Sequence, residues 1–190
     1  MTNIKYILDV DGTVTKTNIY TPIVLKLSIE KKYISLALLY LLYPLIVLID
    51  FISRPLHQYV LYKLFRKFLI NYKYNKELIS CYKEKEIAII NELINNIKGK
   101  HDVYFITTNL NIINQFLEKR YNPKKIYSVD LDKITLKYLR EFKNNAIKEI
   151  VEEDNNSVLI GIADSKYDMC FLLKCDKAYL LKQNKLMKIL

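Results

Sequence analysis

The chain has 190 residues, of which 51% are hydrophobic, and it carries a formal net charge of +10. This length suits one domain with an insertion rather than two enzyme domains, and the hydrophobic content excludes a disordered protein. The positive charge favours anionic partners such as phosphate esters or an anionic membrane surface. We expect no specific nucleic-acid partner.

The cysteines and the amino end indicate a reducing compartment. Cys81, Cys170 and Cys175 form no CxxC pair and leave an odd number, so the sequence predicts neither a disulfide framework nor a zinc site. The first residues lead directly into an apolar run, without the features of a signal peptide. We therefore expect a cytoplasmic protein, with peripheral attachment to a membrane as the alternative that the insertion described below raises.

Two carboxylates end the first apolar run of the chain. Residues 5–8 predict a buried strand, and Asp9 and Asp11 follow it at once. Ligands of open parallel α/β sheets bind beyond the carboxyl ends of the strands, so this position predicts chemistry. Gly12 then allows a tight turn close to a ligand, and Thr13 offers a hydroxyl and an N–H group.

Residues 18–85 interrupt this pattern. A polar connection and the start of a helix at 23–27 lead to residues 33–52, which carry no charge from Tyr33 through Ile49. Three interpretations compete: a membrane-spanning helix, a hairpin bent near Pro44 at the membrane interface, and a cap helix buried against protein or in a dimer contact. A single crossing would separate Asp9 and Asp11 from everything after the insertion, which argues against the first.

A basic amphipathic helix is predicted over 56–69, beside the apolar segment. This arrangement is typical of proteins that lie on an anionic membrane, although a plain surface helix has the same pattern. His57 is a lone histidine in this helix, and we interpret it as structural.

Strands and helices alternate over the rest of the chain. This alternation predicts an α/β fold with a doubly wound parallel sheet covered on both faces. The expected helices are 83–98, 110–119, 143–152 and 167–173, and the expected strands are 102–106, 125–129, 158–162 and 177–181.

Four segments together resemble the haloacid dehalogenase-like phosphohydrolases. Residues 9–15 match that family's DxDGT motif, and a hydrophobic strand ending in Thr107 resembles its second motif. Lys143, predicted to open a helix, resembles the third, with Lys148 as the alternative. The strand 158–162 followed by Asp164 and Asp168 resembles the fourth, although Ala163 stands where the family usually has glycine.

The spacing of these motifs is similar to the phosphoserine-phosphatase-like branch with a helical C1-type cap. The resemblance implies a Rossmann-like core at 1–17 and 86–190 and an inserted helical cap at 18–85. The apolar cap also resembles those of related domains in membrane lipid enzymes.

The resemblance also implies the roles of individual residues. Asp9 would attack phosphorus and form an aspartyl-phosphate, and Asp11 would act as general acid and base. Thr107 and Lys143 complete the catalytic group. The expected phosphate-binding residues are Gly12, Thr13, Thr107, Thr108 and Lys143.

We expect Mg²⁺ as the cofactor. Carboxylates on strand-end loops suit this hard cation, which prefers oxygen ligands. Asp9, the backbone carbonyl of Asp11 and Asp164 would hold it, and Asp168 would support that group.

The expected function is a Mg²⁺-dependent phosphatase acting on a phosphorylated small molecule or a lipid-linked phosphomonoester. Two alternatives remain open: a non-catalytic module that binds lipid or protein, and a phosphotransferase that uses the same aspartyl-phosphate.

Overall fold

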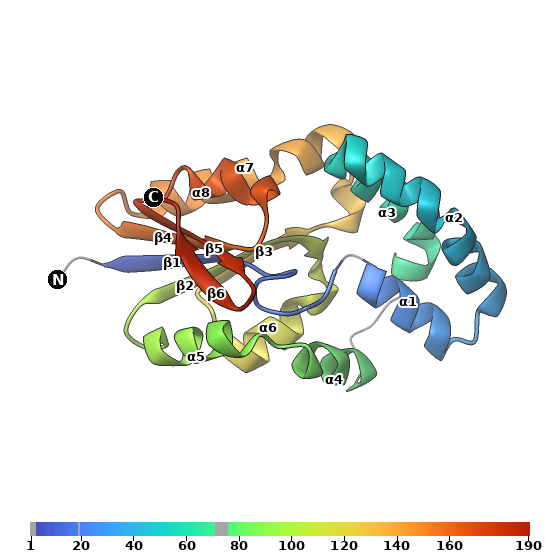
Figure 1. Ribbon diagram of the computed structural model, residues 1–190, viewed down its shortest axis with the longest axis horizontal. Coiled ribbons are helices and arrows are strands. Elements are labelled where there is room, and N and C mark those ends of the chain that lie inside the picture. The colour runs from blue at the N-terminus through green and yellow to red at the C-terminus, as the bar shows by residue number, and fades with distance from the viewer. Residues whose placement is uncertain (1–2, 19, 71–75) are drawn as a thin grey trace.

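The computed structural model describes residues 3–18, 20–70 and 76–190. Its centre is a six-stranded sheet with the order β3-β2-β1-β4-β5-β6 (Figure 1). β1 (Ile4–Asp9) lies between β2 (Asp102–Leu110) and β4 (Val158–Ala163), and it is parallel to both. β3 (Lys125–Val129) and β5 (Lys177–Lys182) extend the sheet in the same direction. The predicted parallel sheet is thus confirmed.

The sixth strand departs from this prediction. β6 (Lys185–Lys188) is antiparallel to β5 and follows it through a two-residue turn. Gln183 and Asn184 have φ angles of 49° and 57°, which are the left-handed values of a tight hairpin. The sequence analysis took 177–181 as the last strand, because Gln-Asn is a weaker turn signal than a glycine-containing pair.

Helices cover both faces of the sheet (Figure 1). α5 (Ala88–Ile97) and α6 (Asn114–Tyr121) lie on one face, and α7 (Leu136–Glu153) and α8 (Met169–Leu172) on the other. Successive β1 side chains point to opposite faces, so Ile7 and Leu8 belong to two different hydrophobic clusters. Both side chains are fully buried, which fixes the register of β1 at the centre of the fold.

Several predicted boundaries were wrong. α7 begins at Leu136, capped by the Thr135 side chain, and not at residue 143. β2 continues through Leu110, and the helix expected at 110–119 consists of η1 (Asn111–Ile113) and α6. The helix expected at 83–98 is divided, because α4 (Lys76–Glu84) ends where Thr15 forms a bridge with Glu86, and α5 starts after it. Two short 3-10 helices, η2 (Leu131–Lys133) and η3 (Lys166–Asp168), precede α7 and α8.

The insertion forms a helical cap at one end of the core (Figure 1). It comprises α1 (Tyr20–Ile29), α2 (Tyr33–Ile52), α3 (Arg54–Ile70) and α4. α1, α2 and α3 pack on one another, and α3 also packs on α7 of the core. The cap therefore stands over the edge of the sheet at which β1, β2 and β4 end.

α2 is one continuous helix, so the interpretation as a hairpin bent near Pro44 was wrong. Pro44 removes one backbone hydrogen bond, but contacts with α1 and α3 support the helix on both sides of it. α2 is not buried within this chain either, because only Leu39 and Ile46 of α2 are buried, and the dimer contact stays a prediction. By length and composition α2 could cross a membrane, and it is the only helix among the described residues that meets this criterion.

Candidate active site

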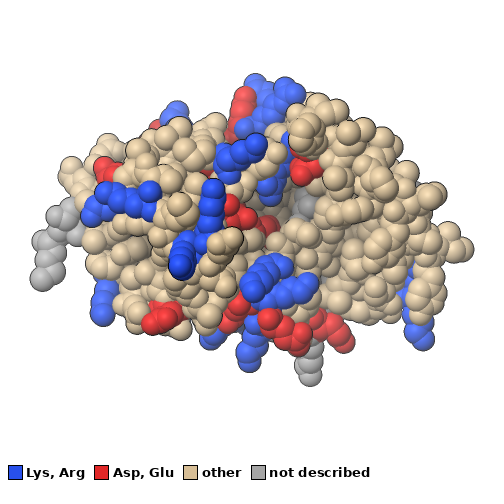
Figure 2. Space-filling view, in the orientation of Figure 1, with Lys and Arg blue, Asp and Glu red and all other residues tan. Residues whose placement is uncertain are grey.

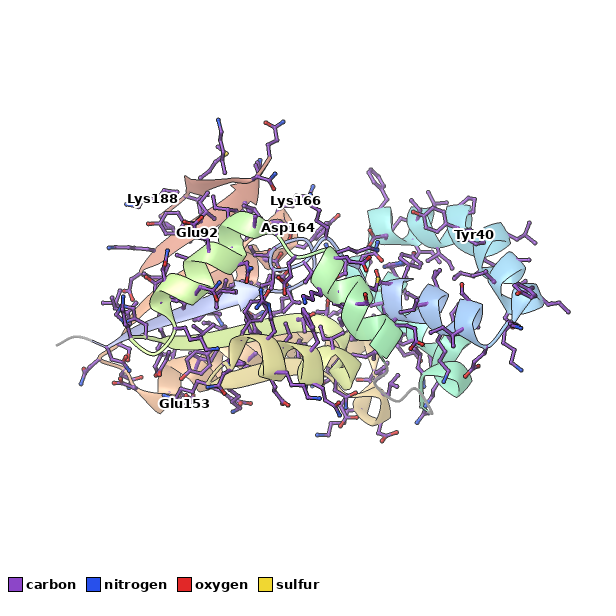
Figure 3. The ribbon with its side chains drawn as sticks, turned by 90° about the horizontal axis from the view of Figure 1, so that it is seen from below. Tyr40, Glu92, Glu153, Asp164, Lys166 and Lys188 are labelled. Atoms are coloured by element: carbon purple, nitrogen blue, oxygen red, sulfur yellow. The ribbon has the colours of Figure 1, made fainter. Side chains whose placement is uncertain are left out.

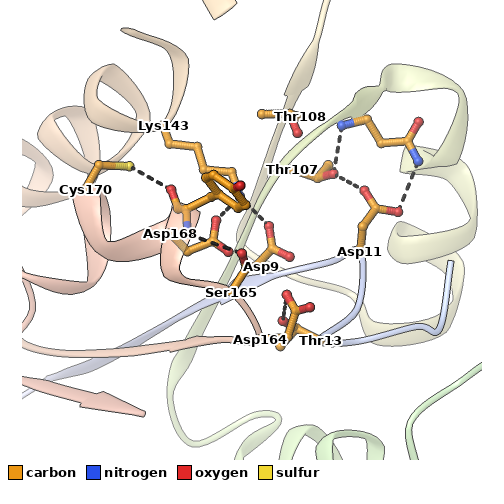
Figure 4. A network of polar contacts seen from close by, with 12 residues as sticks. Asp9, Asp11, Thr13, Thr107, Thr108, Lys143, Asp164, Ser165, Asp168 and Cys170 are labelled. Atoms are coloured by element: carbon orange, nitrogen blue, oxygen red, sulfur yellow. Dashed lines mark hydrogen bonds and ion pairs between the residues drawn. The ribbon is translucent and has the colours of Figure 1, made fainter. Parts of the chain in front are cut away.

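The loop after β1 brings two carboxylates to the sheet edge. Asp9 is the last residue of β1 and is buried, and Asp11 lies two residues further on. The carbonyl of Val10 accepts hydrogen bonds from three successive N–H groups, those of Thr13, Val14 and Thr15. This compact turn holds both carboxylates in fixed positions (Figure 4).

Gly12 is required by the geometry of this turn. Its φ angle is +85°, a left-handed value that favours glycine, and a Cβ atom placed on it would lie 2.2 Å from Oδ2 of Asp164. The Thr13 hydroxyl donates to the other oxygen of Asp164 across 3.4 Å. The first and fourth sequence motifs are therefore in direct contact.

Lys143 links the same two motifs from the other side. Its ammonium group donates to Oδ1 of Asp9 at 2.5 Å and also to Oδ1 of Asp168. Burial acts to lower the pKa of Lys143, but the charges of Asp9 and Asp168 outweigh it and raise the pKa above its usual value. The sequence analysis predicted Lys143 at the start of a helix. In the structure it lies inside α7. Lys148, the alternative, is 71% exposed and pairs with Glu152.

Three carboxylates converge beside this lysine. Oxygen atoms of Asp9, Asp164 and Asp168 lie within 4.8 Å of one another. Burial raises the pKa of Asp9, with Asp168 and Asp11 adding to the effect and Lys143 opposing it. Burial, followed by the charge of Asp168, also raises the pKa of Asp164. One ammonium group thus faces three carboxylates, and the remaining negative charge and hard oxygen donors fit a divalent cation such as Mg²⁺.

Asp11 lies in a second, separate set of hydrogen bonds (Figure 4). Its carboxylate accepts from the hydroxyls of Thr17 and Thr107, both at 3.0 Å, and from the Asn109 amide at 3.2 Å. The Asn109 amide also donates to the hydroxyl of Tyr82, a buried residue of α4. The loop, β2 and the cap therefore all help to orient Asp11.

The two consecutive threonines at the end of β2 have different surroundings. The Thr107 hydroxyl is fully buried, donates to Asp11 and accepts from the backbone N–H of Asn109. The Thr108 hydroxyl accepts from the amide of Gln58 at 2.7 Å, and the Thr108 carbonyl accepts from the hydroxyl of Tyr62 at 2.6 Å. Thr107 thus forms hydrogen bonds with Asp11 and Asn109 inside the core, whereas Thr108 connects the core to α3 of the cap.

The fold brings the predicted site residues together: the strand-end and loop residues lie where β1, β2 and β4 end, and Lys143 reaches Asp9 and Asp168 from α7. Sequence analysis missed Thr17, Gln58, Tyr82 and Asn109. Asn109 could have been found, because it directly follows the two threonines at a strand end. No local signal distinguishes Gln58 or Tyr82, whose place depends on how the cap packs. His57 lies outside the site, between Tyr20 and Asp50 in the cap.

No family model matches the chain, and no curated protein matches it. Solved structures do. A substrate-bound phosphoserine phosphatase aligns with a TM-score of 0.57 and 11% identity, covering 94% of this chain and 85% of the other. The magnesium-bound HAD-hydrolase YfnB from Bacillus subtilis aligns with a TM-score of 0.58 and 16% identity, covering 100% and 93%.

A phospho-aspartyl intermediate analogue of phosphoserine phosphatase aligns with a TM-score of 0.53 and 14% identity over 94% of this chain and 86% of the other. These similarities define the class of the fold. The chain has the haloacid dehalogenase-like fold, as the sequence motifs predicted.

Proposed function

We propose that the chain is a phosphatase that hydrolyses a phosphomonoester through a covalent phosphoryl group on Asp9. The observation that carries this proposal is the site itself: a buried strand-end carboxylate bound by Lys143, beside the oxygens of Asp164 and Asp168. The similarity in fold to phosphoserine phosphatase, including a phospho-aspartyl intermediate analogue, supports it.

In the first step, an Asp9 oxygen forms a bond to phosphorus while the bond from phosphorus to the ester oxygen breaks. Asp11 gives its proton to the alcohol that leaves. In the second step a water molecule attacks the same phosphorus, Asp11 takes the proton from that water, and the bond to Asp9 breaks. Phosphate and the regenerated carboxylate are the products.

The other residues position and balance charge. Lys143 holds Oδ1 of Asp9 in place and offsets the negative charge that approaches with the phosphoryl group. Thr107 and Asn109 both donate hydrogen bonds to Asp11 and so orient this acid and base. The backbone N–H of Asn109 in turn donates to the Thr107 hydroxyl. Gly12, Thr13 and Thr108 are the further groups that we assign to phosphate binding.

Asp9, Asp164 and the backbone carbonyl of Asp11 would hold Mg²⁺, with Asp168 supporting them. When bound there, the ion supplies positive charge that stabilises the phosphoryl oxygens in the transition state.

The direct test uses the purified protein with 4-nitrophenyl phosphate and Mg²⁺. Asp9→Asn should reduce turnover to background, whereas Asp132→Asn, a change at a side chain that is 83% exposed, should leave turnover unchanged. Chelation with EDTA should abolish activity, and added Mg²⁺ should restore it. Substantial activity in the Asp9→Asn protein would contradict the nucleophile assignment.

A broader screen with sugar, amino-acid, nucleotide and lipid phosphates separates the alternatives. No hydrolysis of any of them would favour a non-catalytic binding module. Transfer of phosphate to an added alcohol, in excess over release of free phosphate, would favour a phosphotransferase.

We also propose that α2 places this site at a membrane surface, where a lipid-linked phosphomonoester is within reach. Leu39 and Ile46 face the cap, and most of the other apolar side chains of α2 are exposed, including Ile34 at 89% and Phe51 at 87%. Figure 2 shows this part of the cap as a broad uncharged surface. Such a contiguous apolar area marks an interaction site.

The packing of α2 favours a helix that lies along the membrane rather than across it. α2 keeps its contacts with α1 and α3, which a crossing would break. Lys31 and Lys32 are exposed at its amino end, where they would meet anionic headgroups. Figure 3 shows Tyr40 on α2, far from Asp164 at the junction of core and cap, so the membrane would contact the outer side of the cap.

Flotation with anionic vesicles at low salt tests this proposal. The wild-type protein should float, and the Leu41→Glu, Phe51→Glu double variant should not. Leu173→Glu is the matched control, because Leu173 is exposed but belongs to the core. If the wild-type protein stays monomeric and unbound, α2 has no role at a membrane and soluble phosphates become the preferred substrates.

A further inference from the structure

A cavity of about 150 Å³ opens beside the candidate active site. It lies between α3 of the cap and α7 and η3 of the core, and Lys143 and Asp168 form part of its wall. Whatever fills this cavity is therefore adjacent to the phosphoryl group bound at Asp9. Its volume equals that of about five water molecules in the liquid, which suits a short alcohol with one further functional group.

Two arginines line this cavity, Arg54 from the cap and Arg140 from the core. The chain has two other arginines, and both pair with carboxylates: Arg66 with Asp132 and Arg120 with Glu86. Among the residues that the structure describes, neither Arg54 nor Arg140 forms an ion pair with a carboxylate. The two unpaired guanidinium groups of the described chain thus occur at the same cavity.

The rest of the cavity wall, as far as the structure describes it, offers these arginines no acidic partner. Asp168 is the only carboxylate among the described residues that form the wall, and Lys143 already binds it. The Arg54 guanidinium lies over the ring of Tyr167, 5.1 Å from the ring centre. This cation–π contact helps to hold the guanidinium group in place. The positive charges of two guanidinium groups around one cavity repel each other, and an anion bound between them would reduce this repulsion.

We propose that Arg54 and Arg140 bind a second anionic group of the substrate, a carboxylate or a phosphate carried by the alcohol that is released. This inference rests on the proposed phosphatase activity and names its substrate class. Guanidinium groups suit this task because they bind such anions through two parallel hydrogen bonds. An anion held from both sides also connects the cap to the core while the phosphoryl group reacts.

The same wall disfavours a substrate with an ammonium group. Phosphoserine carries one, and none of the described residues of the wall offers a free carboxylate to receive it. The proposal therefore predicts a substrate preference different from that of the phosphoserine phosphatases that share the fold.

Three substrates of equal length test the proposal: 3-hydroxypropyl phosphate, 3-phosphonooxypropanoate and propane-1,3-diyl bisphosphate. The wild-type protein with Mg²⁺ should prefer the second or the third over the first, and the choice between them shows whether the second anion is a carboxylate or a phosphate. Arg54→Gln and Arg140→Gln should each lower this preference in kcat/KM about tenfold, mainly through KM.

Arg66→Gln is the matched control, because Arg66 is on the same helix as Arg54 but pairs with Asp132 outside the cavity. It should leave the preference unchanged. Arg54→Lys should retain part of the preference, since it keeps the charge and loses the paired hydrogen bonds.

Calorimetric binding of the same compounds, in EDTA, separates the two possible failures. Tighter binding of the two compounds with a second anionic group to the wild-type protein than to the arginine variants, without turnover, would support the arginine site and overturn the phosphatase proposal. Turnover of all three compounds at similar kcat/KM would support the phosphatase and overturn the arginine site.

Discussion

The core and the cap of this protein differ in where their charged and apolar side chains lie. In the core, charges lie inside and are paired: Lys143 binds Asp9 and Asp168, and the buried Lys5 donates to the carbonyls of Ile150 and Asp154. In the cap, apolar side chains of α2 lie outside, and Arg54 faces a cavity without a carboxylate partner.

This difference indicates which region acts on its surroundings. Buried polar groups normally find hydrogen-bond partners within the protein, and the charged groups of the candidate site follow that rule, since Lys143 binds both Asp9 and Asp168. The exposed apolar side chains of α2 could be buried against a partner, and the guanidinium group of Arg54 could bind an anion. The outer side of the cap is therefore a surface whose partner lies outside the described chain, whereas the core lacks only a cation and the anion that we propose for Arg140.

Among the predictions that compare the two regions, the largest effect should come from Gly12→Ala, which acts on the core alone. The added methyl group would lie 2.2 Å from Oδ2 of Asp164, at a φ angle of +85°, so either the turn or Asp164 must move. A displacement of about 1 Å at reacting groups costs on the order of 10² in kcat/KM. Steady-state kinetics with an aryl phosphate and Mg²⁺ measure it.

Gly99→Ala is the control, because Gly99 has a similar φ angle of +77° but open space where the Cβ atom would be. It should lower stability slightly and leave kcat/KM unchanged. Equal losses of activity in both variants would mean that backbone strain, and not contact with Asp164, explains the effect.

A second prediction compares two leucines of α2 that are two residues apart. Leu39 is 2% exposed and Leu41 is 76% exposed. Leu39→Ala should lower the free energy of unfolding by about 3 kcal/mol, because it leaves a cavity between the cap helices. Leu41→Ala should change it by less than about 0.5 kcal/mol. Urea denaturation measures both.

Similar losses for both variants would contradict the conclusion that the outer side of α2 is exposed in the free protein. They would mean that a second copy of the chain or another protein covers the outer side of α2. A concentration-dependent midpoint would then identify a second copy as that cover.

The sequence predicted the core well because its signals are short and local. Asp9 and Asp164 each follow a buried run directly, and parallel strands must end at one sheet edge, so their meeting could be predicted. Thr17 and Tyr82 could not, because they reach Asp11 through the packing of the loop and α4. Lys143 was found from the family resemblance, although its helix starts seven residues earlier than expected.

The cap was harder to predict because α2 has no polar face. When nearly every side chain is apolar, periodicity cannot show which side is buried. Only the structure distinguishes Leu39 and Ile46, seven residues apart and therefore on one side of the helix, from the exposed remainder. For the same reason the sequence left the membrane, hairpin and buried interpretations open.

The smallest predicted effect concerns His57, which connects three cap helices. Its ring contacts the Tyr20 hydroxyl at 2.6 Å through Nε2 and Asp50 at 3.2 Å through Nδ1. Burial lowers the pKa of His57; Asp50 opposes this effect and Arg54 adds to it. The unfolded chain therefore binds more protons than the folded chain near pH 6.5, so stability rises with pH there and falls as the pH drops below it.

The free energy of unfolding should therefore be lower at pH 5.5 than at pH 7.5, as measured by urea denaturation. His57→Gln should remove this dependence, because glutamine does not titrate. Asp50→Asn should strengthen it, since the group that opposes the lowered pKa is gone. If the free energy of unfolding of His57→Gln changes with pH as that of the wild-type protein does, other groups cause the pH dependence. The contacts of His57 in the cap would then not contribute to it.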